Sequence, residues 1–437
     1  MKPAPHILVA GGGVAAVEAV VALRALAGPL PRITLLAPGD ELPQRPAAVA
    51  APFGFGLPAP LPFDAIRRHA PFDLRRGTLA AVDPERHVAT DDAGAELAYD
   101  KLLVAVGARP VPALEGAITF AGAADAPAVA AALDETARLA FVLPSASSWA
   151  LPVYELALMA AAELRDRGAE PELTVVTAEP APLWVFGAEA AAAIRDLLAE
   201  RGIALRTGMR VGDAAALDAD RVIALPLLRG PAVPGLEHDQ DGFLPVDRHG
   251  RVVGAPDVFA AGDATTFPLK QGGLAAQQAD AAAAAIAAEL GVPVEPAPFA
   301  PVIRGLLLTG GAPLYLRAEL TVSGEPDNVT SRRPSAAVSQ RTLWWPPGKI
   351  AGRYLAPLLA TARPQLLAPA QLQDYRPGAV DEDRDDAREL ALLLAGEEAA
   401  LGDYAQALRA LDAAAALSGG LLPEEWARRR DEWRMMI

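Results

Sequence analysis

Short apolar runs alternate with alanine-rich segments of helical length along the first two thirds of the chain. The run 7–10 is followed by three glycines and by a segment, 15–27, that predicts a helix ending at Gly28-Pro29. A second apolar run comes at 33–36. This order is typical of a strand–helix–strand unit with a parallel sheet, so we predict an α/β fold from the N-terminus onward.

A second α/β unit is predicted further along the chain. Glycines 168 and 202 close its two expected helices. Its expected elements are strands at 139–143, 173–177, 203–207 and 222–225 and helices at 153–167 and 189–201. The proline-rich stretch 38–63 predicts a long irregular loop. The chain then returns to the first unit through 258–263 and a helix at 273–290, and strands are expected within 300–320.

Composition narrows the classes of function. The chain has 437 residues, 52% hydrophobic, which suffices for two or three domains. The net charge of −15 argues against nucleic-acid binding. No cysteine is present, which excludes disulfides, thiolate metal sites and thiol catalysis. The five histidines show no ligand spacing, so we expect no metal. Without a signal-peptide pattern or a long apolar span, the expected location is cytoplasmic.

The glycine turn after the first strand carries the first chemical signal. In Gly11-x-Gly13-x-x-Ala16 the first glycine permits the tight turn, the second admits a pyrophosphate and the small third residue lets the helix pack. The helix N-terminus then faces the phosphates. An acid for the ribose is missing at its usual place, which is Ala37. The candidate substitutes are Asp40 and Glu41.

A second signal lies roughly 250 residues later. The run 258–261 ends in Gly262-Asp263, and Lys270-Gln271 with two further glycines follow. In this order and spacing, the two signals predict that one FAD is bound by two distant parts of the chain. The predicted chemistry is electron transfer.

Over residues 5–320 these motifs resemble the pyridine nucleotide–disulfide oxidoreductase superfamily, and within it the sulfide:quinone oxidoreductases and type II NADH dehydrogenases. The resemblance implies two Rossmann-like dinucleotide-binding domains, a small α+β third domain and a helical tail. We place the discontinuous FAD domain at 1–112 and 236–298, the second Rossmann-like domain at 113–235, the third domain at 299–380 and the tail at 381–437.

The resemblance also implies roles for single residues. Asp263, with Gly262, would bind the ribityl chain, and Lys270 and Gln271 would lie near the pyrimidine end of the flavin. A lysine there stabilises negative charge on the reduced ring; the alternative is a solvated loop lysine. Further implied cofactor contacts are Arg45, Val82, Ala105 and Gly107.

The second unit departs from the family pattern. Residues 144–152 contain no glycine, and Trp149 and Leu151 stand where a pyrophosphate needs open backbone. We therefore expect no NAD(P) in the usual groove. The cysteine pair of the sulfide enzymes is also missing. Glu155 is, by analogy, a candidate for handling a proton beside the flavin; the alternative is a glutamate that offsets the helix dipole.

The C-terminal third has fewer signals. Residues 343–362 combine tryptophans, apolar residues, Lys349 and Arg353, which suggests peripheral contact with the inner face of a membrane; the alternatives are a lid over the flavin domain and a homodimer contact. The acidic run 381–386 predicts a linker. Residues 402–408 resemble one tetratricopeptide unit, but one unit does not make an array, so we expect a helical hairpin.

The leading hypothesis is an FAD-dependent oxidoreductase. It would pass two electrons from a small donor to a quinone-like or other acceptor, without cysteine chemistry. One alternative is an NAD(P)H dehydrogenase with a non-standard nucleotide site. The other is a flavin-bearing binding protein with low turnover whose tail recruits a partner.

Overall fold

The computed structural model describes most of the chain. Described are residues 3–43, 45–55, 59–135, 138–146, 148–169, 172–322, 329–331, 337–341, 343–344, 348–350, 352–362, 404–417 and 421–436, and the single residues 388, 392, 395, 396 and 399.

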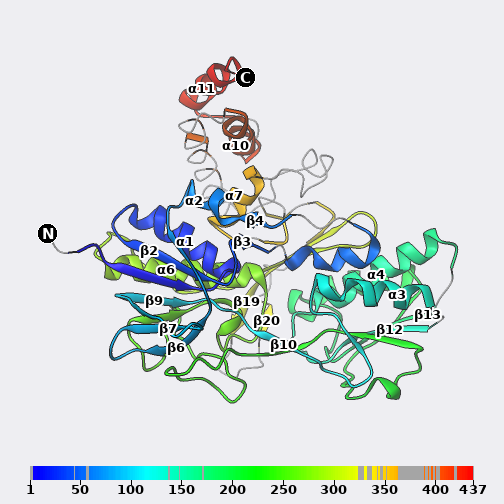
Figure 1. The fold of residues 1–437 in the computed structure, drawn as a ribbon. Helices are drawn as coiled ribbons and strands as arrows, with labels where there is room; N and C mark the ends of the chain where they lie inside the picture. The colour runs from blue at the N-terminus through cyan, green and yellow to red at the C-terminus, as the bar shows by residue number, and fades with distance from the viewer. Residues whose placement is uncertain are drawn as a thin grey trace.

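The first unit is built on a parallel five-stranded sheet of order β17-β9-β1-β2-β5. Its strands are β1 (His6–Ala10), β2 (Arg32–Ala37), β5 (Asp73–Arg76), β9 (Lys101–Val104) and β17 (Val258–Ala260). Helices α1 (Val14–Ala27) and α6 (Gly272–Glu289) cover one face, and β6 (Leu79–Asp83), β7 (Val88–Asp91) and β8 (Glu96–Ala98) lie against the other (Figure 1).

Burial on both faces explains the continuous apolar runs of these strands. Ile7 and Val9 of β1 pack with α1 and α6, whereas Leu8 and Ala10 pack with the small sheet. A parallel strand covered on both sides has no polar face, so its sequence does not alternate.

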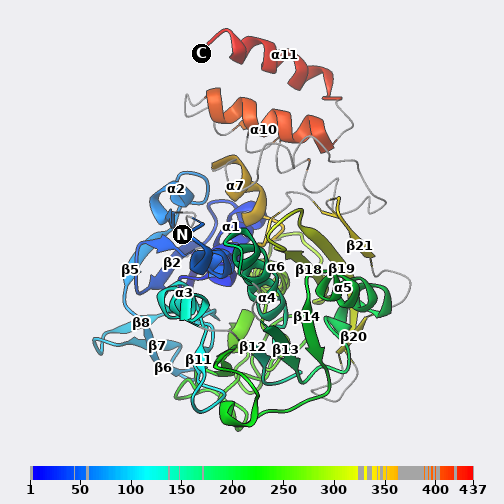
Figure 2. The same ribbon diagram turned by 90° about the vertical axis from the view of Figure 1, so that its right-hand side faces the viewer.

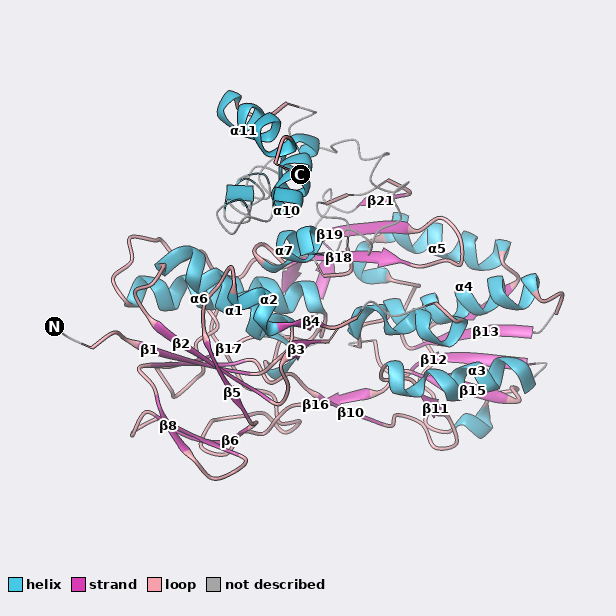
Figure 3. Cartoon of the chain, turned by 45° about the horizontal axis from the view of Figure 1, so that its top comes forward, coloured by secondary structure: helices cyan, strands magenta, loops and turns pink. Residues whose placement is uncertain are grey.

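The second unit is built on a similar parallel five-stranded sheet of order β11-β15-β12-β13-β14, in which the outer strand β11 comes first in the chain rather than last. Its elements are β11 (Ile118–Thr119), η2 (Ala123–Asp125), α3 (Ala126–Glu135), β12 (Arg138–Leu143), α4 (Leu151–Asp166), β13 (Glu172–Thr177), η3 (Trp184–Phe186), α5 (Ala188–Glu200), β14 (Ile203–Arg206), η4 (Ala214–Ala216) and β15 (Arg221–Ala224). The antiparallel pair β10 (Arg109–Val111) and β16 (Leu227–Arg229) lies between the two units (Figure 3).

An antiparallel sheet follows, made of β18 (Val302–Leu307), β19 (Leu314–Val322), β20 (Val329–Ser331) and β21 (Ala337–Ser339). Helix α7 (Leu355–Ala362) leads to the hairpin of α10 (Tyr404–Leu417) and α11 (Glu424–Arg434), which stands above the body (Figure 2). The predicted fold class, including the helical tail, is confirmed. The domain limits stay a prediction, and the acidic run 381–386 lies outside the described residues.

The stretch 38–63 is more ordered than the predicted loop. It contains β3 (Glu41–Leu42), the 3₁₀ helix η1 (Arg45–Phe53) and β4 (Leu61–Pro62), before α2 (Phe63–Arg67). Ala48 and Val49 of η1 are buried against the second unit. Proline fits 3₁₀ and extended backbone, which the sequence pattern did not distinguish from an irregular loop.

Candidate functional site

The turn between β1 and α1 is tight because β9 runs beside it. The Gly11 N–H donates to the Leu36 carbonyl at 2.8 Å. Gly11 has a φ of +135°, and a Cβ there would lie 2.1 Å from the Ala105 carbonyl oxygen. At Gly13, by contrast, a Cβ would meet no atom within 4 Å, and no side chain caps α1. The turn thus leaves unpaired helix N–H groups facing open space, as a pyrophosphate requires.

The two distant sequence motifs lie side by side. A Cβ on Gly262 would lie 3.2 Å from the Cβ of Ala15 and 3.1 Å from that of Ala275. The Ala105 N–H donates to the Ala10 carbonyl at 2.7 Å, and the Ala261 N–H to the Val104 carbonyl at 3.1 Å. Residues 11–13, 105–107 and 262–263 therefore share the carboxyl edge of one sheet, where ligands of α/β folds bind.

Two small residues at this edge, Ala16 and Gly107, leave room close to the backbone. Ala16 is fully buried in α1. Gly107 adopts a left-handed conformation (φ +77°), and a Cβ there would meet nothing within 4 Å. Both observations fit a cofactor that passes close to the backbone.

Asp263 is an acceptor without a donor. It forms no hydrogen bond with another described residue, and burial raises its pKa, while Lys270 and Arg45 oppose that rise. The preceding loop is fixed, because Gly262 N–H donates to Gln278 Oε1 at 2.7 Å. This partly exposed carboxyl has unused acceptor sites, so it can accept hydrogen bonds from the hydroxyl groups of a ligand. The ribityl chain of FAD has such groups, so the residues fit this cofactor.

Lys270 is not a solvated loop lysine. Its ammonium donates to the Thr265 carbonyl and lies 4.0 Å from the centre of the Phe243 ring. Burial lowers the pKa of Lys270 to about 8, against the opposing effect of Asp263 and Asp239. The amine is therefore mostly protonated and positively charged at pH 7, and it loses its proton as the pH rises through about 8.

Gln271 is used inside the protein. Its Oε1 accepts the Leu274 N–H at 2.8 Å and caps α6, and its Nε2 donates to the Arg304 carbonyl at 3.1 Å. Val82 is buried in β6, where its N–H donates to Pro234 at 2.9 Å. Arg45 is exposed at the start of η1.

The two candidate ribose acids are both at the surface. Asp40 forms an ion pair with Arg76, and both side chains are largely exposed. Glu41 is exposed at the start of β3. Neither is drawn toward the glycine turn by a contact with it.

The corresponding crevice of the second unit is filled by the protein's own side chains. Trp149 packs on Phe186, with ring centres 6.1 Å apart. The Tyr154 hydroxyl donates to Glu179 Oε2 at 2.6 Å, and Thr177 Oγ1 donates to the same oxygen at 3.1 Å. Glu179 follows β13, where a dinucleotide-binding unit carries its ribose acid. Here that acid is 1% exposed.

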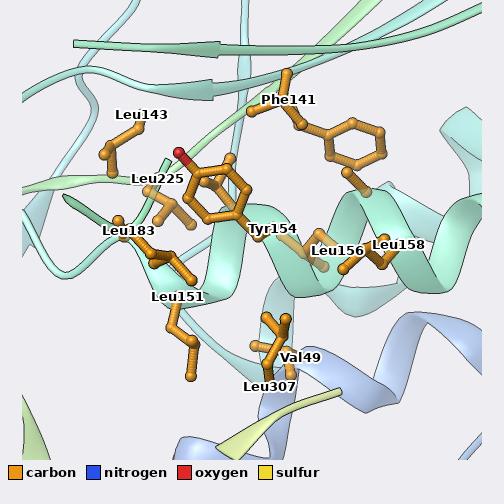
Figure 4. Close-up of a cluster of buried hydrophobic side chains, with 14 of the residues drawn as sticks. Val49, Phe141, Leu143, Leu151, Tyr154, Leu156, Leu158, Leu183, Leu225 and Leu307 are labelled. Atoms are coloured by element: carbon orange, nitrogen blue, oxygen red, sulfur yellow. The ribbon is translucent and has the colours of Figure 1, made fainter. Parts of the chain in front are cut away.

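Burial governs the charge of this cluster. It raises the pKa of Glu179 to about 7 and that of Tyr154 well above its ordinary value. The Tyr154 ring lies among apolar side chains, including Leu143, Leu183 and Leu225 (Figure 4). A ribose could reach Glu179 only if this packing opened.

Glu155 is held by two donors from the C-terminal side of the chain. Its Oε1 accepts the Leu308 N–H at 2.9 Å and the Lys349 ammonium at 2.5 Å. The Glu155 side chain is 1% exposed. Burial raises its pKa, and Lys349 opposes the rise. The carboxylate is thus part of a buried ion pair, which the sequence did not predict.

Most of the described side chains of the segment 343–362 pack against the rest of the protein. Trp344, Ile350, Leu355 and Leu358 are buried, and Lys349 is 16% exposed. This burial favours the predicted lid over the predicted membrane contact. Trp345 lies outside the described residues. Within the part that the structure describes, no helix is long and apolar enough to cross a membrane.

Comparison with known proteins identifies the family of this chain. The chain matches the Pyridine nucleotide-disulphide oxidoreductase family over residues 5–285 and belongs to that family. Among curated proteins, none matches it. It is an FAD-dependent oxidoreductase, as predicted.

Solved structures share the fold at low sequence identity. A sulfide:quinone oxidoreductase from Aquifex aeolicus has a TM-score of 0.66 and 20% identity, over 77% of this chain and 87% of that one. A ferredoxin reductase from Rhodopseudomonas palustris has a TM-score of 0.57 and 21% identity, over 74% and 86%. A putidaredoxin reductase bound to putidaredoxin has a TM-score of 0.55 and 19% identity, over 77% of this chain and 90% of that one.

Proposed function

We propose that this oxidoreductase takes two electrons from a small donor other than a pyridine nucleotide and passes them to a quinone-like or other small acceptor. The observation that carries the proposal is the closed crevice of the second unit. The acid that would bind a nucleotide ribose is hydrogen-bonded to Tyr154 instead. The chain also has no cysteine, so the donor does not react through a protein thiol.

When bound, FAD supplies the two-electron redox chemistry. The residues of the first unit would hold it as the sequence predicts. Gly11 and Gly13 admit the pyrophosphate, and Asp263 accepts from the ribityl hydroxyls. Lys270 supplies a positive charge near the pyrimidine end, which favours the reduced state.

Glu155 is our candidate for moving the proton that accompanies the electrons. It belongs to α4, and the start of this helix packs in the same core as the start of α6. The two are joined through β18, because Gln271 bonds to Arg304 and Glu155 to Leu308. Four residues along a strand span about 13 Å, so β18 links this carboxyl to the segment of Lys270 and Gln271 over about that distance.

The test is an anaerobic titration of the purified, flavin-loaded protein, followed at the visible flavin band. Separate arms add NADH, NADPH, sulfide and a soluble quinol. We expect at least one of the other donors to bleach the flavin band, and a quinone added afterwards to restore it. We expect neither pyridine nucleotide to bleach the band, even over a period many times longer than that donor needs.

Each other outcome is decisive. Rapid bleaching by NADPH or NADH would overturn the proposal and favour the NAD(P)H dehydrogenase alternative. A protein that holds FAD but is reduced by no donor would favour the binding protein. In that case, removal of the α10–α11 hairpin should change the partners that the protein retains.

A further inference from the structure

Two buried glutamates occupy equivalent places in the two units. Glu18 is the fifth residue of α1, and Glu155 is the fifth residue of α4. These helices follow the central strand of each sheet, β1 and β12. Glu18 is fully buried and Glu155 is 1% exposed. A carboxylate buried this deeply persists only with dedicated donors.

Both glutamates take donors from one short segment, which we call the strap (residues 348–350 and 352–355). Lys349 donates to Glu155 at 2.5 Å. Five and six residues later, the N–H groups of Tyr354 and Leu355 donate to Glu18 at 2.6 and 3.0 Å. The strap therefore connects the first helix of one unit to the first helix of the other.

The hold on Glu18 is specific. Tyr354 and Leu355 lie at the N-terminus of α7, so Glu18 satisfies helix N–H groups as a capping residue does, although it comes from another helix. A Cβ on Gly352 would lie 2.1 Å from Glu18 Oε2. Only glycine lets the strap come this close.

A second carboxyl stabilises the anion. Asp280 of α6 is hydrogen-bonded to Glu18, and burial together with the Glu18 charge raises the pKa of Asp280 well above its ordinary value. Asp280 is thus the protonated partner and donates to Glu18. Arg353, from the strap itself, opposes the rise.

The other end of the strap is also fastened. Trp344 Nε1 donates to the Gly348 carbonyl at 3.2 Å, and the indole packs on Tyr315 of β19 at 5.3 Å. With both ends fixed, Lys349 has little freedom to leave Glu155. Among the described residues, Lys349 and the Leu308 N–H are the groups that face this carboxylate.

We propose that Lys349 is a positioning residue for Glu155, delivered by a strap that Glu18 anchors. While the strap is in place, Glu155 is kept as a shielded carboxylate. When the strap leaves, Glu155 loses the cation that stabilises its charge and gains access to water. The catalytic part of this inference rests on the proposed function, whereas the anchoring does not.

Anchoring is tested by labelling lysines of the flavin-loaded protein with an amine-reactive reagent and locating the label by mass spectrometry. The chain has only four lysines, at 2, 101, 270 and 349, so each is followed separately. In Gly352→Ala we expect Lys349 to react at least fivefold faster than in the wild type, and Lys101 to be unchanged. The matched control is Gly348→Ala, since a Cβ there would meet nothing closer than 3.8 Å.

A second variant guards against a Gly352→Ala protein that does not fold. In Glu18→Gln the side chain keeps its size but has no negative charge. Hydrogen exchange of the backbone N–H groups of residues 354 and 355 should then become faster. Unchanged Lys349 labelling in Gly352→Ala, or unchanged exchange in Glu18→Gln, would overturn the strap.

The positioning role is tested by the pH dependence of flavin reduction. Removing the cation in Lys349→Met should move the inflection that belongs to Glu155 to higher pH by about one unit or more, because Lys349 lowers this pKa. Lys349→Arg should restore it. An unshifted profile would overturn the positioning role, even if the labelling result holds. Loss of the proposed function itself would show as no reduction in the wild type.

Discussion

The two α/β units are built on similar parallel sheets, yet only the first leaves room at the turn that follows its central strand. In the first, three residues join strand to helix, and Gly13 faces free space. In the second, seven residues make the same connection, and one of them, Trp149, packs on Phe186. The comparison teaches that a shared topology does not define a binding site, and that the side chains at the strand ends do.

The acids make the contrast sharper. The first unit lacks a ribose acid at Ala37, while its Asp40 is paired at the surface. The second unit has the acid, Glu179, but bonds it to Tyr154. One unit therefore has space without the usual acid, and the other has the acid without space.

The largest effect should come from closing the open crevice. Gly11→Ala places a Cβ against the Ala105 carbonyl and forces a side chain into a positive φ, so we expect an unstable protein with almost no flavin. Gly13→Ala has room within the protein, so the flavin-free variant should keep the Tm of the flavin-free wild type but bind FAD at least tenfold more weakly. The measurements are the flavin absorbance and the Tm of both variants. Wild-type FAD affinity in Gly13→Ala would show that the pyrophosphate does not bind at this turn.

The next effect concerns the closed crevice. Tyr154→Phe removes the shorter of the two side-chain hydrogen bonds to the buried Glu179, which costs about 1–3 kcal/mol. Urea unfolding at pH 7 measures it. Leu156 lies on the same helix and is fully buried without polar contacts, so Leu156→Met, with little expected cost, is the control. If Tyr154→Phe were neutral and also bound NADH, the crevice would not be closed by this hydrogen bond.

Glu179 should also make stability depend on pH. Its pKa is raised from 4.5 to about 7 in the folded protein. The folded state then binds more protons than the unfolded state between these values, so its contribution to stability falls as pH rises from about 4.5 to 7 and is constant above. The difference between wild type and Glu179→Gln, by urea unfolding across this range, isolates the contribution. A flat difference would contradict the raised pKa.

A smaller effect is expected at Lys270. Below its pKa of about 8 the amine is charged, so Lys270→Met should lower the flavin midpoint potential at pH 7 by on the order of 30 mV, about 1.4 kcal/mol for two electrons. The wild-type potential should lose this advantage above pH 8, and Lys270→Arg should keep it there. Spectroelectrochemical titration at several pH values decides, and equal potentials in all three proteins would place Lys270 away from the ring.

The smallest effect is expected at Asp40. Because its ion pair with Arg76 is largely exposed, Asp40→Asn should leave Tm nearly unchanged. We also expect FAD affinity to stay within twofold, measured by flavin fluorescence on dilution. A tenfold loss would show that Asp40 serves as the missing ribose acid.

The sequence was informative where the backbone itself carries the function. The glycines of the turn and the Gly262-Asp263 pair predicted both the fold and the edge at which the cofactor residues meet, because only glycine fits those close approaches. The substitution of bulky residues at 144–152 likewise predicted a second crevice unlike the first.

Pairings between distant side chains were not predictable. Lys349 and Glu155 are 194 positions apart, and neither belongs to a local pattern that names the other. The sequence pattern suggests Lys349 only as part of a membrane contact, and it does not distinguish Glu18 from other helical glutamates. Such pairs depend on how α4, β18 and the strap pack together, which periodicity does not encode.

The inserted position of the second unit also affects how the protein is made. Strand β17 completes the first sheet beside β9, but about 150 residues separate the two in the chain. At about 5–20 residues per second of synthesis, the apolar edge of β9 waits roughly 8–30 s for its neighbour. During that interval the nascent chain exposes the unpaired apolar edge of β9 and cannot yet bind FAD. We therefore expect chaperone binding to be greatest before the ribosome reaches Val258.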